Sequence, residues 1–235
     1  MNSEMSSEKK LIYVDNNATT PVAPEVFEAM VPYFRSEYFN PSSAYNEALF
    51  AHTSVEKSRG TIAQLLGNVD PTEITFTSCA TESNNMAIFG ALRANQNRNH
   101  IITTTVEHPA VLQVCKEVQK YGAKVTYLPV NRSGELDITE FVKALTADTL
   151  LVSIMHANNE TGVIFPIEEL SRITKETNPK IIFHTDATQT VGKLNIDLNS
   201  NSGNFRYVDL LSFSGHKLHA PKGIGSIFIR KGTSI

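Results

Sequence analysis

The motif Ser214-Gly215-His216-Lys217 places a lysine among polar side chains directly after an apolar run. If Lys217 is buried beside apolar walls or other cations, its amine loses affinity for a proton and can form a Schiff base with an aldehyde. Lysines outside such surroundings are usually solvated, so a solvated loop lysine is the alternative. The sequence therefore offers one candidate amine for covalent chemistry.

Two more side chains have chemistry that complements this amine. Asp186 lies three residues beyond Phe183 in a second apolar run, where its carboxylate could meet a protonated pyridine nitrogen and keep that ring an electron sink. An ordinary Asx turn after a strand explains Asp186 equally well. His108 precedes Pro109 at a predicted helix start, where it could stack on a ligand, transfer protons or serve only as a loop residue.

The stretch from Ser78 to Thr81 is a candidate anion site. It leads from a predicted strand into a predicted helix, and the free N–H groups and positive dipole end of a helix favour an anion such as phosphate. Ser78 or Thr81 could instead merely cap that helix. The sequence contains neither GxGxxG nor GxxxxGK[ST], which weakens dehydrogenase and NTPase interpretations.

Metal binding is a weaker alternative. His184-x-Asp186 and His216-xx-His219 contain ligand types at short spacings. On its strand, His184 alternates away from the neighbours of Asp186. The second pair lies in a loop flanked by Pro and Gly, without a helix to align the rings. We therefore predict no metal site.

The hydrophobic pattern predicts the elements that must position these residues. Short runs rich in β-branched residues are typical of strands, and amphipathic stretches between them are typical of helices. The predicted strands are residues 73–77, 100–106, 124–128, 149–155, 181–185, 207–213 and 225–230. The predicted helices are residues 24–38, which Pro32 should kink or divide, 44–66, ended by Gly67, and then 81–96, 109–121, 138–145 and 167–177.

This alternation predicts an α/β fold with a mainly parallel sheet and helices on both faces, because strands that are apolar throughout are buried on both sides. The last strand follows Pro221-Lys222-Gly223 too closely for a helical crossover, so we expect it to be antiparallel. Ligands bind at the carboxyl ends of strands in such sheets. The polar loops that follow the strands should therefore meet in one pocket.

Composition limits the classes of function. The 235 residues allow one large domain or two small ones, and a net charge of −3 makes a nucleic-acid-binding face unlikely. No apolar run approaches the roughly 18–20 residues of a membrane span. Residues 1–11 lack a secretory signal and are expected to form a disordered arm. With two cysteines and no disulfide framework, we expect a soluble cytoplasmic protein.

Several long motifs in order resemble the pyridoxal-phosphate-dependent cysteine desulfurases of the NifS/IscS group. The resemblance extends from Ile12 to Arg230. The motifs are DNNATTP (15–21), TSCATESNN (77–85), VEHPAV (106–111), NNETG (158–162), HTDATQ (184–189) and SFSGHK (212–217). The resemblance implies the large domain of a fold type I pyridoxal phosphate (PLP) enzyme.

It also implies a role for each site residue. Lys217 would form the Schiff base with the cofactor, Asp186 would pair with the ring nitrogen, and His108 would stack on the ring and move protons. The remaining predicted contacts are Gln189 and Asn159 to the ring hydroxyl side, and Ala80, Thr81, Ser214 and His216 to the phosphate. The implied reaction converts L-cysteine to L-alanine, and sulfur passes through an enzyme persulfide to an acceptor such as an iron–sulfur scaffold protein.

The sequence departs from the family pattern at one point that matters. The persulfide cysteine, the arginine for the substrate carboxylate and a phosphate contact from the second subunit lie, in the family, beyond the position of Ile235. Cys79 beside the phosphate loop and Cys115 in a helix are interpreted as small buried residues. We therefore expect residues 12–235 to be the large domain without the C-terminal small domain, with little turnover, and to form a homodimer.

Two other functions fit the same residues. A selenocysteine lyase or a class V aminotransferase would share the fold and the lysine. A binding or dimerisation module would hold cofactor or partners without catalysis.

Overall fold

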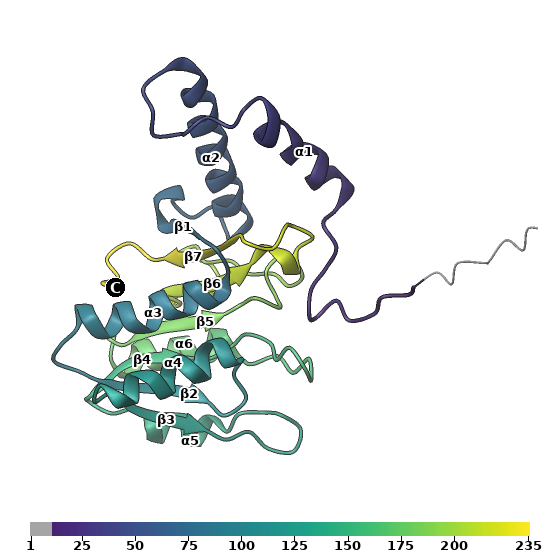
Figure 1. The fold of residues 1–235 in the computed structure, drawn as a ribbon. Coiled ribbons are helices and arrows are strands. Elements are labelled where there is room, and N and C mark those ends of the chain that lie inside the picture. The colour runs from purple at the N-terminus through teal and green to yellow at the C-terminus, as the bar shows by residue number, and fades with distance from the viewer. Residues whose placement is uncertain (1–10) are drawn as a thin grey trace, which may run out of the picture.

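A seven-stranded sheet runs through the computed structural model, which describes residues 11–235 (Figure 1). The strands are β1 (Ile74–Thr77), β2 (His100–Thr104), β3 (Lys124–Leu128), β4 (Thr149–Ser153), β5 (Ile182–Asp186), β6 (Leu210–Ser214) and β7 (Gly225–Ile229). Their order across the sheet is β1-β7-β6-β5-β4-β2-β3. The predicted N-terminal arm lies outside the described residues except for Leu11.

The sheet is mainly parallel, as predicted. Neighbouring strands from β3 through β6 pair in parallel, whereas β7 is antiparallel to both β6 and β1. The chain between β6 and β7 contains only the short 3-10 turn η2 (Gly215–Lys217), so no helical crossover returns it to the opposite edge. The expected antiparallel strand near the C-terminus is therefore confirmed.

Helices cover both faces of the sheet. On one face lie α3 (Ala80–Ala94) and α4 (Pro109–Lys120), and on the other lie α5 (Ile138–Ala144) and α6 (Ile167–Thr177) (Figure 1). Ile101 and Leu151 pack in the first layer, while their neighbours Ile102 and Val152 pack in the second. All four side chains are fully buried, and each contributes on the order of 1.5–3 kcal/mol relative to exposure.

Two helices precede the sheet. The long helix α2 (Asn46–Leu65) ends before Gly67, whose φ of 102° suits a residue without a side chain. A short 3-10 turn, η1 (Pro71–Glu73), then leads into β1.

The helix α1 (Pro24–Arg35) runs unbroken past Pro32, so Pro32 does not divide it, and the kink that was the other alternative stays a prediction. Proline removes one amide donor from the helix. Because α1 has no buried residue, water can hydrate the carbonyl that this donor would have met, and the Ser36 N–H still donates to the Pro32 carbonyl at 2.9 Å.

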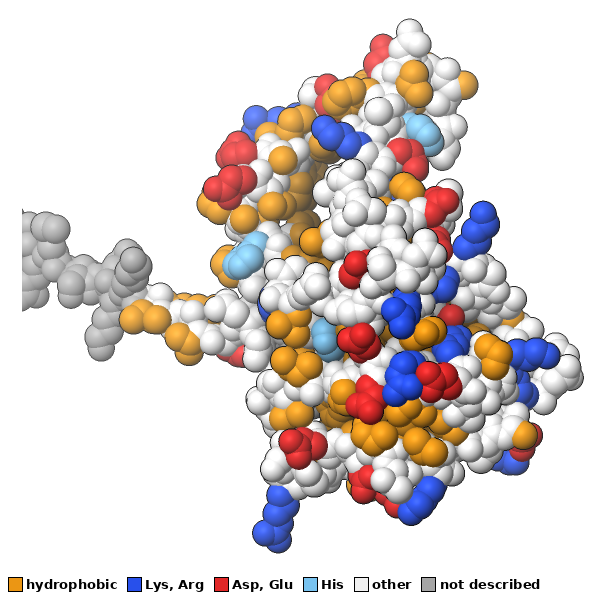
Figure 2. Space-filling view, turned by 180° about the vertical axis from the view of Figure 1, so that it is seen from behind, with side chains coloured by type: hydrophobic (Ala, Val, Ile, Leu, Met, Phe, Trp, Pro, Cys, Tyr) orange, Lys and Arg blue, Asp and Glu red, His pale blue; other side chains and the backbone are white. Residues whose placement is uncertain are grey.

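Apolar side chains reach the surface on these two helices. Figure 2 shows hydrophobic side chains at the surface in the part of the molecule that contains α1 and α2. Phe27, Phe34, Leu49 and Phe50 are each more than half exposed. Among residues 11–235, no helix combines the length and the apolar character needed to cross a bilayer.

Candidate active site

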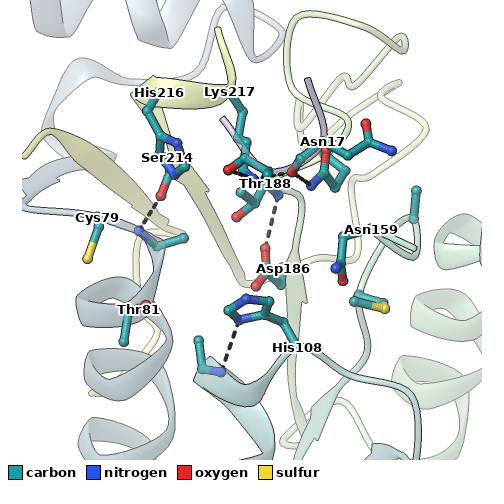
Figure 3. Close-up of a pocket in the computed structure, with 16 residues that line it drawn as sticks. Asn17, Cys79, Thr81, His108, Asn159, Asp186, Thr188, Ser214, His216 and Lys217 are labelled. Atoms are coloured by element: carbon teal, nitrogen blue, oxygen red, sulfur yellow. Dashed lines mark hydrogen bonds between the residues drawn. The ribbon is translucent and has the colours of Figure 1, made fainter. Parts of the chain in front are cut away.

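One cavity of about 250 Å³ opens where the polar loops after the strands converge (Figure 3). Every predicted site residue lines it: Ala80, Thr81, His108, Asn159, Asp186, Gln189, Ser214, His216 and Lys217. The wall also contains residues to which the sequence interpretation gave no role: Asn17, Ala18, Cys79, Ala110, Met155, Ala157 and Thr188. The predicted convergence of the loops on one pocket is therefore confirmed.

Lys217 is half-buried in this cavity rather than solvated in a loop. Its Nζ donates to the carbonyl oxygens of Asn17 and Ala18, the latter at 2.7 Å. Burial, and then the positive charge of Lys193, lower the pKa of Lys217, while Asp15 and Asp186 act in the opposite direction. A lowered pKa increases the fraction of neutral amine, which is the form that attacks an aldehyde.

Asp186 ends β5 and is 7% exposed. One carboxylate oxygen, Oδ1, accepts the Thr188 N–H at 3.0 Å, which is the Asx turn that the sequence left open. The other oxygen, Oδ2, accepts from Asn84 Nδ2 at 2.7 Å. The Asx turn therefore occupies only Oδ1, and Asn84 orients the carboxylate separately through Oδ2.

His108 is the N-cap of α4, and its Nδ1 accepts the Ala110 N–H at 3.1 Å. This bond leaves Nε2 to carry the proton in the neutral ring. Figure 3 shows the His108 ring beside Asp186, at the wall opposite Lys217. The helix start therefore fixes both the tautomer and the position of this ring.

The N-terminus of α3 carries no side-chain cap, so the capping alternative for Ser78 and Thr81 is wrong. The N–H and hydroxyl of Ser78 instead donate to the Glu82 carboxylate, each at 2.6 Å. The Ala80 N–H donates to Ser214 Oγ at 2.7 Å, which leaves the Ser214 hydroxyl proton for another acceptor. A helix N-terminus without a cap from its own side chains, beside a hydroxyl that can donate, is suited to an anion.

Cys79 is not the buried residue that the sequence predicted. Its side chain is partly exposed and lines the cavity at the N-cap of α3, beside β7, whose first residue Gly225 leaves room for it. Burial raises the pKa of the Cys79 thiol, but the nearby Glu82 amide, Ser78 hydroxyl and Thr81 outweigh burial and lower this pKa overall. Cys115 is buried as predicted, and burial raises its pKa to about 12.

The N-terminal segment forms one wall of the site. The Thr20 N–H and hydroxyl both donate to the His216 carbonyl, at 3.0 and 2.9 Å, and Thr19 Oγ1 lies 3.1 Å from His216 Nδ1. Burial and the charges of Lys217 and Lys222 lower the pKa of His216, which keeps its ring neutral near pH 7. The motif DNNATTP (15–21), to which the sequence interpretation gave no role in the site, was the sequence signal for this wall.

Two buried polar atoms in the wall lack a partner. Gln189 donates through Nε2 to the Asn17 carbonyl at 3.0 Å, but its Oε1 has no hydrogen-bond partner, and neither has Thr188 Oγ1. Buried polar atoms in folded proteins are normally paired with protein, water or ligand. These two atoms therefore mark a place where a polar ligand group fits.

The metal alternative has no geometric support in the described residues. Both ring nitrogens of His184 face hydroxyl groups, Ser153 at 2.8 Å and Ser212 at 3.0 Å, and the side chain is fully buried. Residues 11–235 contain no group of three His, Cys, Asp or Glu side chains arranged to hold a metal ion.

A mainly parallel sheet covered on both faces, with a lysine-bearing cavity where its polar loops meet, defines an α/β protein with a small-molecule site. Residues 12–234 match the family described as Aminotransferase class-V, and the chain belongs to this family.

Two relatives of this chain are named cysteine desulfurases. The chain is 51% identical over 222 residues to cysteine desulfurase 2 of Trichormus variabilis, covering 94% of this chain and 54% of that protein. It is 46% identical to the cysteine desulfurase NifS of Azotobacter vinelandii, with the same coverage. The chain spans about half the length of the curated relatives it matches.

Solved structures agree with this relationship. A NifS-like protein superimposes with a TM-score of 0.90 at 44% identity, covering 95% of this chain and 60% of that one. A second structure, SspA in complex with cysteine, superimposes with a TM-score of 0.85 at 39% identity, covering 93% and 61% of the two chains. The expected resemblance to NifS/IscS cysteine desulfurases, and the fold it implies, are confirmed.

Proposed function

We propose that this cavity binds PLP and that the chain provides the cofactor site of a cysteine desulfurase. The observation that carries the proposal is the presence of three complementary groups around one cavity. They are the half-buried amine of Lys217, the carboxylate of Asp186 and the uncapped N-terminus of α3. An aldehyde, a protonated ring nitrogen and a phosphate are the groups that these three would bind.

The residues present fit the cofactor. Gln189 Oε1 and Thr188 Oγ1 are buried in the cavity wall without partners, so polar groups of a ligand can satisfy them. The cavity volume of about 250 Å³ is slightly below the range of small-molecule pockets, which begins at roughly 300 Å³. When bound, PLP supplies an electron sink that stabilises negative charge at the substrate Cα.

Lys217 is the proposed attachment point. Its lowered pKa favours the neutral amine, while the Asn17 and Ala18 carbonyls accept hydrogen bonds from Nζ and hold it at the cavity wall. A neutral amine that donates to both carbonyls still has its lone pair free to attack an aldehyde. The N-terminal segment therefore orients the lysine.

Asp186 and His108 are proposed to act at the ring. The Asp186 carboxylate is held at both oxygens, so it is pre-oriented toward a positively charged partner. His108 carries its proton on Nε2 because Nδ1 accepts the Ala110 N–H, so the ring face is available for stacking and Nε2 for proton transfer. Asn159 and Gln189 are proposed to reach the hydroxyl side of the ring.

The phosphate end is proposed to use Ala80, Thr81, Ser214 and His216. Ser214 accepts the Ala80 N–H and therefore directs its own hydroxyl proton to another acceptor. The neutral His216 ring donates from Nε2 when Nδ1 accepts the Thr19 hydroxyl. Hydrogen bonds and the dipole of α3, rather than a full cationic charge on His216, would hold the phosphate at this end.

The proposed reaction converts L-cysteine to L-alanine. A thiolate would bond to the substrate Sγ and form a persulfide as the Cβ–Sγ bond breaks; the electron pair of that bond would stay with the carbon part, which gains a proton to give alanine. The sulfur would then pass to an acceptor such as an iron–sulfur scaffold protein. Neither thiol of this chain suits the sulfur-accepting role. Cys115 is buried with a pKa of about 12, and Cys79 lies at the proposed phosphate end.

Reductive trapping tests the cofactor site. The chain is titrated with PLP, reduced with borohydride and digested, and mass spectrometry should find the pyridoxyl group on the Lys217 peptide. Lys217→Ala should lose this label, whereas Lys116→Ala, an exposed lysine on α4, should keep it. Labelling spread over several lysines, or unchanged in Lys217→Ala, would overturn the proposal.

We also propose a cytoplasmic homodimer. The exposed apolar side chains of α1 and α2, including Phe34 at 74% exposure, support a protein contact on this part of the surface. Free Cys79 and Cys115 suit a reducing compartment. Light scattering of the chain should give twice its 25.9 kDa mass, and a monomer over the full concentration range would contradict the dimer.

A further inference from the structure

Asn84 contacts the central carboxylate of the site from outside the cavity wall. It lies in the second turn of α3 with its side chain fully buried, and its Nδ2 is 2.7 Å from Asp186 Oδ2. This amide is the only side chain that donates to Asp186 among the described residues, since the other donor is the Thr188 backbone.

The orientation of this amide is informative. Asn84 Oδ1 is buried without a hydrogen-bond partner, and an unsatisfied buried acceptor is destabilising. Turning the amide over would place Oδ1 against Asp186 Oδ2, oxygen against oxygen. The observed orientation leaves one acceptor unpaired and in return gives the carboxylate a charge-assisted hydrogen bond.

The same helix reaches both ends of the cavity. Its first residue, Ala80, donates to Ser214 at the proposed phosphate end, and Asn84, four residues later, donates to Asp186. Residues four apart lie on one face of a helix, one turn from each other. A single rigid element therefore fixes the spacing between the two groups that would hold opposite ends of a ligand.

We infer that Asn84 is a positioning residue that holds the Asp186 carboxylate in its ligand-facing orientation and thereby sets the affinity for PLP. This inference rests on the proposed function, because PLP is the ligand whose ring nitrogen Asp186 would meet. Asn84 acts only through Asp186. Its removal should therefore have little effect on PLP binding once the Asp186 carboxylate is gone.

A double-mutant cycle tests this dependence. The variants are Asn84→Leu, which keeps the side-chain size and removes the donor, Asp186→Ala, and the two combined. PLP affinity is measured by absorbance titration. Asn84→Leu should weaken binding about tenfold or more when Asp186 is present and less than about twofold when it is replaced, because a hydrogen bond to a charged group contributes about 1.5–3 kcal/mol.

The same cycle in the cofactor-free chain separates the contact from the proposed function. Urea unfolding should show that Asn84→Leu is less destabilising in the Asp186→Ala background, because the pair is already broken there. Asn84→Ala serves as a second variant if the leucine chain does not fold. Asn95→Leu, at the other end of α3 and outside the cavity lining, is the matched control and should bind PLP normally.

Each outcome is decisive. Equal losses of PLP affinity from Asn84→Leu in both backgrounds would show a general structural effect and overturn the inference, as would binding within twofold of the unmodified chain. If the effects of the Asn84 and Asp186 substitutions on the free energy of unfolding simply add, the two side chains do not interact and the inference is overturned. Failure of the unmodified chain to bind PLP would overturn the proposed function and the positioning role with it, whatever the unfolding cycle shows.

Discussion

The Nζ atom of Lys217 lies 2.7 Å from the backbone carbonyl oxygen of Ala18, although 199 residues separate them along the chain. This contact makes the N-terminal segment part of the lysine's surroundings. The adjoining Thr20 binds the loop that carries the lysine, through the His216 carbonyl. The reactivity of Lys217 thus depends on residues from the opposite end of the sequence.

Thr20→Val tests this dependence. Thr20 is 3% exposed, and its hydroxyl donates to the His216 carbonyl while accepting the His219 N–H. Valine has nearly the same shape but removes both side-chain bonds: the His219 N–H loses this acceptor, and the His216 carbonyl keeps only the Thr20 N–H. The free energy of unfolding should therefore fall by about 1–3 kcal/mol, and PLP affinity should fall with it. Urea unfolding and absorbance titration measure the two effects. Thr20→Ser, which keeps the hydroxyl, should restore most of both.

Thiol alkylation should distinguish the two cysteines. Cys79 is partly exposed with a lowered pKa, whereas Cys115 is buried with a pKa of about 12, so iodoacetamide should modify Cys79 alone in the folded chain. PLP bound at the N-terminus of α3 should slow this modification at least severalfold. Mass spectrometry of the two cysteine peptides gives both rates. Equal modification with and without saturating PLP would argue against the phosphate end assigned here.

Gly225→Ala should disturb the start of α3. A methyl group there would lie 2.7 Å from the Cys79 Cα, and backbone cannot move aside as a flexible side chain can. We expect a loss of about 1–3 kcal/mol in the free energy of unfolding, together with weaker PLP binding.

Gly60→Ala is the matched control. Gly60 lies inside α2 with no atom within 4 Å of the added methyl group, so alanine should stabilise the chain by about 0.5–1 kcal/mol. Chemical denaturation compares the two variants. Similar changes in stability at both positions would contradict the close packing of β7 against Cys79.

Glu107 should make stability depend on pH. Its buried carboxyl binds the Met155 N–H through both oxygens, and burial raises its pKa from 4.5 to about 8. The fold therefore favours the neutral acid, so its contribution is complete below pH 4.5 and is lost as pH rises through about 8.

Glu107→Gln removes this ionisation while keeping an acceptor for Met155. Its unfolding free energy should decline less between pH 4.5 and 8 than that of the unmodified chain, as measured by urea unfolding at a series of pH values. Glu140→Gln, an exposed residue on α5, should follow the unmodified curve. Parallel curves for Glu107→Gln and the unmodified chain would show that Glu107 does not titrate in this range.

Local patterns in the sequence were sufficient to predict the helices and strands of the sheet and their order along the chain. Strand β3 and helix α6 occupy the residues that the apolar periodicity predicted, and the short connection before β7 predicted its antiparallel direction. The motifs and the family resemblance also predicted nine of the residues that line the cavity. Their convergence was expected because loops after parallel strands meet at one edge of a sheet. These features depend on neighbours within a few positions of the chain, which a sequence displays directly.

Tertiary structure alone decided how those residues are held. The donor from Asn84 to Asp186 spans 102 positions, and the contact between Lys217 and Ala18 spans nearly the whole chain. The exposure of Cys79 and the continuity of α1 through Pro32 also depended on which groups pack nearby and which remain open to water. Burial, hydrogen-bond partners and pKa values are properties of the surroundings in space, and residue types alone do not specify those surroundings.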